Sequence, residues 1–259
     1  MQRAFSLVEL SIVLVILGLL TGGILGGQSL IRAAELRSVS TEYNHYVTAT
    51  QTFRDKYFAM PGDMANATAF WGAADSGDGV GIDCTGVSST TAATCNGNGD
   101  GDILYSGNEI FRFWQHLANA GLITGTFTGA SGGGGTLHHV PGTNAPRAKM
   151  NNAGWGATTR NHAGDGGNYT FNYGNAFYFG VPTTTDVPRE AVFKPEEAWN
   201  IDTKMDDGMP GQGKLISING GGSGFNNVQN CNTSISSTDY AGTYRLNITA
   251  LKCAFYMRF

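Results

Sequence analysis

The feature that most constrains the fold is an almost uninterrupted apolar run from Phe5 to Leu25. A helix needs about 20 apolar residues to cross a membrane, and this run supplies them. The run is too long for a cleaved secretory signal, and Arg3 is the only basic residue before it. One carboxylate, Glu9, lies inside the run. Because an ionised carboxylate in a spanning helix costs about 2.5–3.5 kcal/mol, we expect Glu9 to have a partner.

The stretch AFSLVE, residues 4–9, with the apolar helix after it, resembles the N-terminus of type IV pilins and of the pseudopilins of type II secretion. The resemblance is specific from Ala4 to about Arg37. It implies that a membrane prepilin peptidase removes a short leader, residues 1–4, by cutting between Ala4 and Phe5. The new amino group of Phe5 would then be methylated. Ala4 stands where glycine is more frequent in this family.

The resemblance also implies a partner for Glu9. After cleavage Phe5 carries an ammonium group, and in this family the amine that faces the carboxylate belongs largely to the neighbouring subunit. A carboxylate and an ammonium attract strongly enough in a low-dielectric bundle to offset much of their desolvation. Phe5 and Glu9 are therefore the expected assembly residues, and Glu9 would set the axial register between subunits.

Beyond the membrane segment, apolar residues recur at alternating steps of three and four, which is the period of one helix face. The pattern predicts a single helix from Phe5 to about Tyr57, roughly 80 Å long at 1.5 Å per residue. Its apolar part is residues 5–27 and its amphipathic part is residues 28–60, before Pro61-Gly62 stops it. The apolar stripe consists of Leu36, Val39, Tyr43, Tyr46, Thr50, Phe53 and Tyr57, and the opposite polar face of Arg37, Glu42, Asn44, Gln51 and Asp55.

Four glycines lie between the two parts of this helix, namely Gly22, Gly23, Gly26 and Gly27. Each costs about 1 kcal/mol of helix stability relative to alanine. Together they mark a place where a helix can kink or unwind. We expect local unwinding there when subunits pack into a filament.

Residues 62–259 form the predicted head. Charged residues make up only 14% of the chain and glycines number 38, so we expect many turns. The predicted fold class is α+β, as the pilin resemblance also implies: a long N-terminal helix packed on a loop-rich antiparallel sheet. The pattern predicts a helix at 109–120, strands at 169–181, 213–218 and 244–259 with the last two antiparallel, and loops at 132–135, 153–167 and 220–224.

The four cysteines, Cys84, Cys95, Cys231 and Cys253, are spaced too widely for a zinc ribbon. With a membrane-targeting N-terminus, an even number indicates an oxidising compartment and two disulfides. Three pairings are possible, and proximity in the sequence favours Cys84 with Cys95 and Cys231 with Cys253. The second bridge would close the C-terminal region of the head, as in many type IV pilins. In the chain-entropy model it contributes roughly 3 kcal/mol.

Residues 96–103 match the start of a calcium-binding loop. Short oxygen side chains alternate around Gly101, which makes the sharp turn, and they suit a hard cation. Gly107 occupies the place of the closing carboxylate, so other ligands would come from elsewhere in the head. Several pseudopilins bind calcium in the head, whereas a solvated turn is what the composition favours by itself. The candidate ligands are Asn96, Asn98, Asp100, Asp102, Asp75, Asp78 and Asp83.

The remaining composition argues against two function classes. A net charge of −4 is against a nucleic-acid partner, because phosphate binding needs clustered Lys and Arg. The five histidines lie outside any HExxH motif, and the sequence has no GxSxG or P-loop motif, so we do not expect an enzyme. His138 and His139 lie in a glycine-rich loop, where we expect surface exposure.

These observations favour a structural subunit that polymerises through its N-terminal helix into an extracellular filament like a type IV pilus. The expected partners are other copies of the chain, prepilin peptidase and the inner-membrane assembly machinery. The expected location is the inner membrane for the precursor and the cell surface afterwards. Two alternatives remain: a type II secretion pseudopilin, and a minor-pilin adhesin whose head binds a surface or a glycan. Two predicted disulfides and many loops suit an extracellular surface and favour a pilus.

Overall fold

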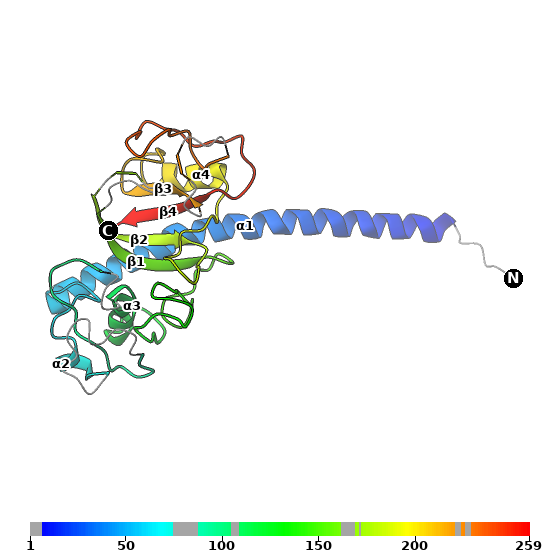
Figure 1. Cartoon of the computed structure of the whole chain (residues 1–259). Helices are drawn as coiled ribbons and strands as arrows, with labels where there is room; N and C mark the ends of the chain where they lie inside the picture. The colour runs from blue at the N-terminus through cyan, green and yellow to red at the C-terminus, as the bar shows by residue number, and fades with distance from the viewer. Residues whose placement is uncertain are drawn as a thin grey trace.

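The computed structural model describes residues 7–74, 88–104, 109–161, 169–170, 172–220, 224–225 and 229–259. In Figure 1 the first half of a long helix, α1, extends away from the rest of the chain, and its second half lies against a head built on a β-sheet. The predicted α+β class, a long helix packed on an antiparallel sheet, is confirmed.

Helix α1 spans Leu7–Tyr57 and contains 51 residues, and its end agrees with the prediction. Phe58 has a φ of 53°, the left-handed conformation that follows many helices, and its N–H bonds to the Arg54 carbonyl oxygen at 2.8 Å. Gly62 has a φ of 85°, and a Cβ atom there would lie 2.4 Å from the Glu109 carbonyl oxygen. The chain therefore enters the head at a position that only glycine fits.

The head contains one four-stranded sheet with the order β1-β2-β4-β3, in which each neighbouring pair is antiparallel. Helix α3 packs beside β1, and α4 packs beside β3 and β4 (Figure 1). The strands are β1 (Gly154–Asn161), β2 (Asn172–Gly180), β3 (Leu215–Asn219) and β4 (Cys253–Arg258), and the short helices are α2 (Thr68–Trp71), α3 (Glu109–Asn119) and α4 (Pro195–Met205).

Several predicted elements are found close to their predicted places. Helix α3, strand β2 and strand β3 correspond to the predictions at 109–120, 169–181 and 213–218, and the last two strands pair antiparallel. The strand predicted from Tyr244 begins only at Cys253, because the residues between them run through turns.

Strand β1 and helix α4 correct the interpretation of the sequence. Strand β1 lies inside the segment predicted as a loop, where Gly154 and Gly156 suggested irregular backbone. A Cβ atom on Gly156 would lie 3.0 Å from Pro188, so this glycine allows close packing on a strand. Helix α4 begins at Pro195, a residue that suits the first helical position, and the Glu197 side chain accepts the Lys194 N–H at 2.9 Å.

The predicted aromatic stripe of α1 packs into the centre of the head. The Tyr46 ring meets Trp114 and Trp155 edge to face, with centroids 5.1 Å and 5.3 Å apart, and Phe53 is fully buried. Each such aromatic pair contributes about 0.5–1.5 kcal/mol beyond the burial of its area. The stripe therefore holds the head on the second half of α1.

Glu42 corrects the predicted polar face, because only 6% of its surface is exposed. It lies one helical turn before Tyr46, on the side that faces the sheet. Its carboxylate accepts hydrogen bonds from Trp155 Nε1 at 2.7 Å and from the Lys149 N–H at 2.9 Å. Both bonds compensate for the loss of water around a buried charge. Glu42 is thus a polar anchor between α1 and the head.

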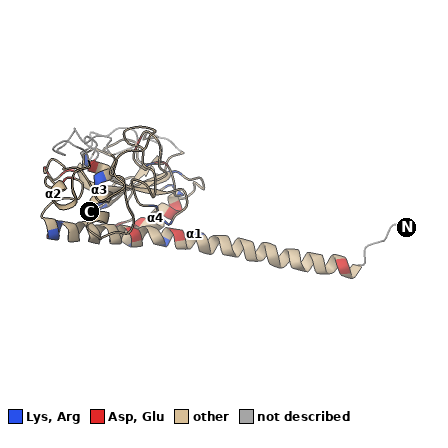
Figure 2. Cartoon of the chain, turned by 90° about the horizontal axis from the view of Figure 1, so that it is seen from below, with Lys and Arg blue, Asp and Glu red and all other residues tan. Residues whose placement is uncertain are grey.

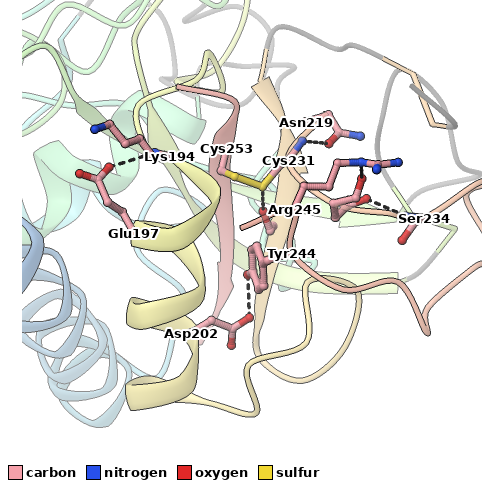
Figure 3. The surroundings of a disulfide bond; sticks show 11 residues. Lys194, Glu197, Asp202, Asn219, Cys231, Ser234, Tyr244, Arg245 and Cys253 are labelled. Carbon is pink, nitrogen blue, oxygen red and sulfur yellow. Dashed lines mark hydrogen bonds between the residues drawn. A yellow bond between two sulfur atoms is a disulfide. The ribbon is translucent and has the colours of Figure 1, made fainter. Parts of the chain in front are cut away.

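A disulfide joins Cys231 to Cys253, the first residue of β4, with Cα atoms 5.1 Å apart (Figure 3). The bridge ties the segment before β4 to an inner strand of the sheet, and Asn219 Oδ1 accepts the Cys231 N–H at 3.1 Å. Cys95 is disulfide-bonded as well. The predicted partner of Cys95 is Cys84, which lies outside the described residues.

We expect Glu42→Ala to lower the free energy of unfolding by about 2–4 kcal/mol, because two buried N–H donors lose their acceptor. Urea denaturation of the detergent-solubilised chain, followed by tryptophan fluorescence, measures this change. Asn44→Ala is the matched control, since Asn44 is exposed on the same helix and should change stability by less than about 0.5 kcal/mol. Equal effects of the two substitutions would contradict an anchoring role for Glu42.

Candidate assembly interface

The first half of α1 is an apolar rod without cover from the head. Residues 7–31 are exposed, apart from the half-buried Gly27, and α1 contains an 18-residue window with a mean hydropathy of 2.4. Figure 2 shows this part of α1 with a single acidic residue near its start, and Glu9 is the only charged residue between positions 7 and 31. By length and composition α1 can cross a membrane.

The few hydroxyl side chains of this rod are satisfied within the helix. Ser11 donates to the Val8 carbonyl oxygen at 2.9 Å, Thr21 to Leu17 at 2.9 Å, and Ser29 to Gly26 at 2.9 Å. A hydroxyl donor in hydrocarbon is costly unless it is hydrogen-bonded, and bonds to carbonyls three or four residues earlier remove that cost. The rod therefore presents an apolar surface even where its sequence contains Ser or Thr.

The helix continues without a break through the four glycines predicted to unwind, Gly22, Gly23, Gly26 and Gly27. A Cβ atom on any of them would meet no other atom within 4 Å, so within one chain nothing requires their small size. The expected unwinding concerns the assembled filament and stays a prediction.

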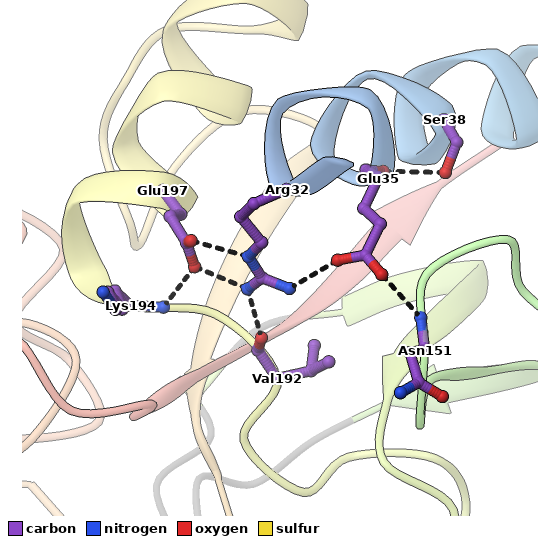
Figure 4. A network of polar contacts seen from close by, with 7 residues as sticks. All are labelled: Arg32, Glu35, Ser38, Asn151, Val192, Lys194 and Glu197. Atoms are coloured by element: carbon purple, nitrogen blue, oxygen red, sulfur yellow. Dashed lines mark hydrogen bonds and ion pairs between the residues drawn. The ribbon is translucent and has the colours of Figure 1, made fainter. Parts of the chain in front are cut away.

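Arg32 joins the rod to the head at the residue where exposure of the rod ends. Its guanidinium donates to both carboxylate oxygens of Glu197 at 2.7 Å, to the Val192 carbonyl oxygen at 3.0 Å and to Glu35 at 3.1 Å (Figure 4). Glu35 in turn accepts the Asn151 N–H at 3.3 Å. Burial raises the pKa of Glu197, but the Arg32 and Lys194 donors outweigh it and keep that pKa below its usual value. A paired, half-buried carboxylate thus fixes the direction in which the rod leaves the head.

A comparison with family models matches residues 1–25 to the prokaryotic N-terminal methylation motif. The chain carries the type IV pilin and pseudopilin signal. No curated protein and no solved structure matches the chain. The signal implies processing by prepilin peptidase, fits a membrane-anchored precursor and suggests a structural subunit rather than an enzyme.

The predicted processing residues of this pilin signal, Ala4 and Phe5, lie outside the described residues. Glu9 lies in the first turn of α1 and is exposed. A carboxylate in the first turn is favoured by the partial positive charge of the helix N-terminus. Glu9 is therefore accessible to a neighbouring copy, and its pairing with the amine of Phe5 stays a prediction.

The predicted calcium loop of the head is held by hydrogen bonds among its own residues. Asn98 Oδ1 accepts the Asp100 N–H at 3.1 Å, and Asp100 Oδ1 accepts the Asp102 N–H at 2.9 Å, as in Asx turns. Asn96 Oδ1 accepts the Thr68 N–H at 2.9 Å. The other three candidate ligands, Asp75, Asp78 and Asp83, lie outside the described residues. Calcium binding at this loop stays a prediction.

Two buried carboxylates outside the predicted ligand set, Asp63 and Glu109, hold this loop. Asp63 accepts the Gly99 N–H at 2.6 Å and the Gly101 N–H at 2.7 Å. Glu109 accepts the N–H groups of Asn98 at 3.2 Å and Leu104 at 2.8 Å. Burial raises the pKa of Glu109 to about 7, and the nearby charges of Asp63 and Asp100 add to this rise, while the N–H bonds oppose it.

A second acidic group lies at the end of α4. Among the described residues, three carboxylates lie close enough together that they could hold a metal ion. One oxygen from each of Asp202, Asp206 and Asp207 lies within 4.8 Å of the other two. Asp202 accepts the Tyr244 hydroxyl at 2.7 Å, and Asp206 accepts the Leu215 N–H at 2.8 Å. These bonds fasten α4 to β3 and to the segment before β4.

The histidines give no catalytic arrangement within the described residues. His116 is fully buried and accepts the Gly62 N–H at 3.0 Å, and burial lowers its pKa to about 3. His139 was expected at the surface but is 1% exposed. Its ring packs on the ring of Phe111, with the two centroids 4.7 Å apart. Burial lowers the pKa of His139 to about 4. Both rings serve the core as neutral groups.

We expect the chain to lose stability as the pH rises from 6.5 to 8. With a folded pKa of about 7 and an ordinary value of 4.5, Glu109 binds more proton in the folded state, so deprotonation favours unfolding. The loss from Glu109 is on the order of 1 kcal/mol, and Asp202, with a pKa of about 7, acts in the same direction. The two buried histidines oppose this loss by a smaller amount, because they are neutral in the folded state but lose protons in the unfolded state, where their pKa is 6.5.

Denaturation of the wild-type chain and of Glu109→Gln at pH 6.5 and 8 measures this effect. The variant should show a smaller decrease, and Glu196→Gln, an exposed residue of α4, should behave like the wild type. A decrease of the same size in Glu109→Gln would show that this carboxyl group does not titrate in the window.

Millimolar calcium is expected to raise the melting temperature, and EGTA to reverse the rise, because a ligand of the native state stabilises by about 2.7 kcal/mol at 100 times its Kd. Asp100→Asn should remove the rise if the loop binds the ion. Asp207→Asn, a substitution in the acidic group at the end of α4, is the matched control and should leave the rise in melting temperature unchanged. An unchanged melting temperature would contradict calcium binding.

Proposed function

We propose that the chain is the structural subunit of an extracellular filament like a type IV pilus. Prepilin peptidase cuts between Ala4 and Phe5, the amine of Phe5 is methylated, and the inner-membrane machinery assembles the subunits into a homopolymer. The apolar rod of α1 anchors the precursor in the membrane and later forms the filament core. One surface, residues 7–31, would serve both the membrane-bound precursor and the filament.

The observation that carries the proposal is the contrast between the two halves of α1. The second half is buried in the head through Phe53 and Tyr46, whereas the first half exposes 15 large apolar side chains between Leu7 and Ile31 to solvent.

 These side chains are Leu7, Val8, Leu10, Ile12, Val13, Leu14, Val15, Ile16, Leu17, Leu19, Leu20, Ile24, Leu25, Leu30 and Ile31. A soluble monomer rarely leaves so large an apolar surface uncovered. The rod is therefore suited to lie in a membrane in the precursor and to pack against other copies in the filament.

Glu9 is the residue on which we propose that assembly depends. Inside a bundle of apolar helices its carboxylate needs a cation, and the methylated amine of Phe5 in the neighbouring copy supplies one. A pair of this kind forms at one axial offset only, which gives the polymer its register. Two alternatives share the same pilin signal, a type II secretion pseudopilin and a minor-pilin adhesin. The membrane rod serves either of them equally well.

We expect Glu9→Gln to insert into the membrane and to be cleaved normally, but to yield few filaments, because the amide cannot pair with the amine of Phe5. Electron microscopy and quantification of sheared surface filaments measure the yield. Glu196→Gln is the matched control, since Glu196 is exposed on α4 of the head. Normal yield from Glu9→Gln would contradict the register role. Sheared filaments in which this chain is only a trace component would favour the adhesin alternative.

A further inference from the structure

A groove of about 750 Å³ runs between α1 and α4, where the exposed rod meets the head. Leu30, Ala33 and Ala34 form an apolar part of its lining, and two cations, Arg37 and Lys204, line it as well. Arg37 comes from α1 and Lys204 from α4, and both side chains are exposed. The groove therefore combines an apolar surface with two positive charges.

Neither of these two cations forms an ion pair with another described residue. Carboxylates at the same junction are engaged elsewhere. Glu35 and Glu197 bind Arg32, and Asp206 accepts the Leu215 N–H at 2.8 Å. Two like charges that line one groove attract an anion, and a phosphate group offers each of them an acceptor for a charge-assisted hydrogen bond.

The position of the groove along α1 places it at a membrane surface. The rod of residues 7–31 is about 37 Å long at 1.5 Å per residue, somewhat more than the ~30 Å hydrocarbon core of a bilayer. Arg37 lies six residues after Ile31, the last residue of the rod. Its side chain tilts toward the N-terminus of α1, which is the membrane side, and a long basic side chain reaches the headgroups in this way.

Helix α4 runs alongside α1 in the same direction. Glu197, in the first turn of α4, binds Arg32 (Figure 4). Burial and, to a smaller extent, the charge of Asp206 just after α4 raise the pKa of Tyr43, so the other end of α4 lies near a residue further along α1. Because both helices begin on the membrane side, the side chain of Lys204 also tilts toward the membrane.

Trp199 is a second sign of a membrane-facing surface on α4. It lies two residues after Glu197, near the end of the rod, and 39% of its surface is exposed. Tryptophan is enriched at membrane interfaces, because its ring is apolar and its N–H is polar. An exposed tryptophan at this level favours contact between α4 and the headgroups.

We propose that the groove between α1 and α4 binds the headgroup of an anionic phospholipid in the membrane-bound precursor. Arg37 and Lys204 contact the phosphate oxygens, and the apolar lining contacts the glycerol and the start of the acyl chains. A zwitterionic lipid also carries a phosphate, but its own cation would face the two basic side chains and lower its affinity. The inference rests on the membrane-anchored stage of the proposed function and does not depend on filament assembly.

Continuity between the rod and the groove argues for a lipid rather than a soluble phosphate. Leu30 is 73% exposed and belongs both to the rod and to the lining of the groove. A lipid beside the rod therefore reaches the two cations without leaving the bilayer. Bound in this way, it would hold the head against the membrane surface.

Native mass spectrometry of the full chain in detergent, titrated with phosphatidylglycerol, tests the proposal. We expect this lipid to bind more tightly than phosphatidylcholine. Arg37→Gln combined with Lys204→Gln should weaken its binding about tenfold or more, since each cation near an anionic lipid surface contributes roughly a factor of five. Arg54→Gln combined with Lys56→Gln is the matched control, because it removes two exposed cations near the other end of α1.

A second variant leaves both cations in place. Ala34→Glu introduces a carboxylate one turn before Arg37, where it competes with the lipid phosphate. It should weaken the binding of phosphatidylglycerol about fivefold. Ala69→Glu, at an exposed alanine of α2, should leave the binding unchanged.

Equal affinity for the two lipids, or unchanged binding by the variant that lacks Arg37 and Lys204, would overturn the proposal. Equally tight binding of soluble glycerol 3-phosphate would also overturn it, because the site would then not need a bilayer. In vesicles, a carbodiimide cross-link from Lys204 to a carboxylate of a second copy would show that protein occupies the groove instead. None of these measurements uses filaments, so failure of the proposed filament function is distinguished from failure of lipid binding.

Discussion

The packing of the second half of α1 against the sheet is the interaction on which the rest of the structure depends. The Tyr46 ring packs against both Trp114 and Trp155, and the Glu42 carboxylate accepts a hydrogen bond from the indole N–H of Trp155. The ring contacts supply buried apolar area, whereas the hydrogen bond fixes the rotation of the helix, because a buried carboxylate has few acceptable positions. One tryptophan on β1 therefore connects the apolar and the polar parts of the contact.

This contact also determines what the first half of α1 can do. Once α1 is held by the head, the rod of residues 7–31 leaves in a direction set by Arg32 and its bidentate pair with Glu197. Its large apolar side chains are exposed rather than packed into the described part of the head, and its hydroxyl groups are already satisfied. Lipid or other copies of the rod are the surroundings that such a surface requires.

The head shows how a chain with few charges can order many loops. Asp63 and Glu109 bind the N–H groups of the 96–104 loop, and Asp206 binds N–H groups at the start of β3. Backbone donors in irregular segments must find acceptors, and carboxylates supply two oxygens each. Burial raises the pKa values of Asp63 and Glu109, so this way of holding a loop makes the stability of the head sensitive to pH.

The long helix, its end near Tyr57, its division into an apolar and a striped part, and the pilin signal could all be predicted from the sequence, because each depends on residues close together in the chain. Tertiary structure decided the burial of Glu42 and His139, the strand at Gly154–Asn161 and the joining of Asp63 to the 96–104 loop. A periodic pattern shows which face of a helix is apolar, but the environment of a single polar residue depends on the distant segment that packs against it. Trp155, far along the chain from Glu42, supplies the donor that makes its burial possible.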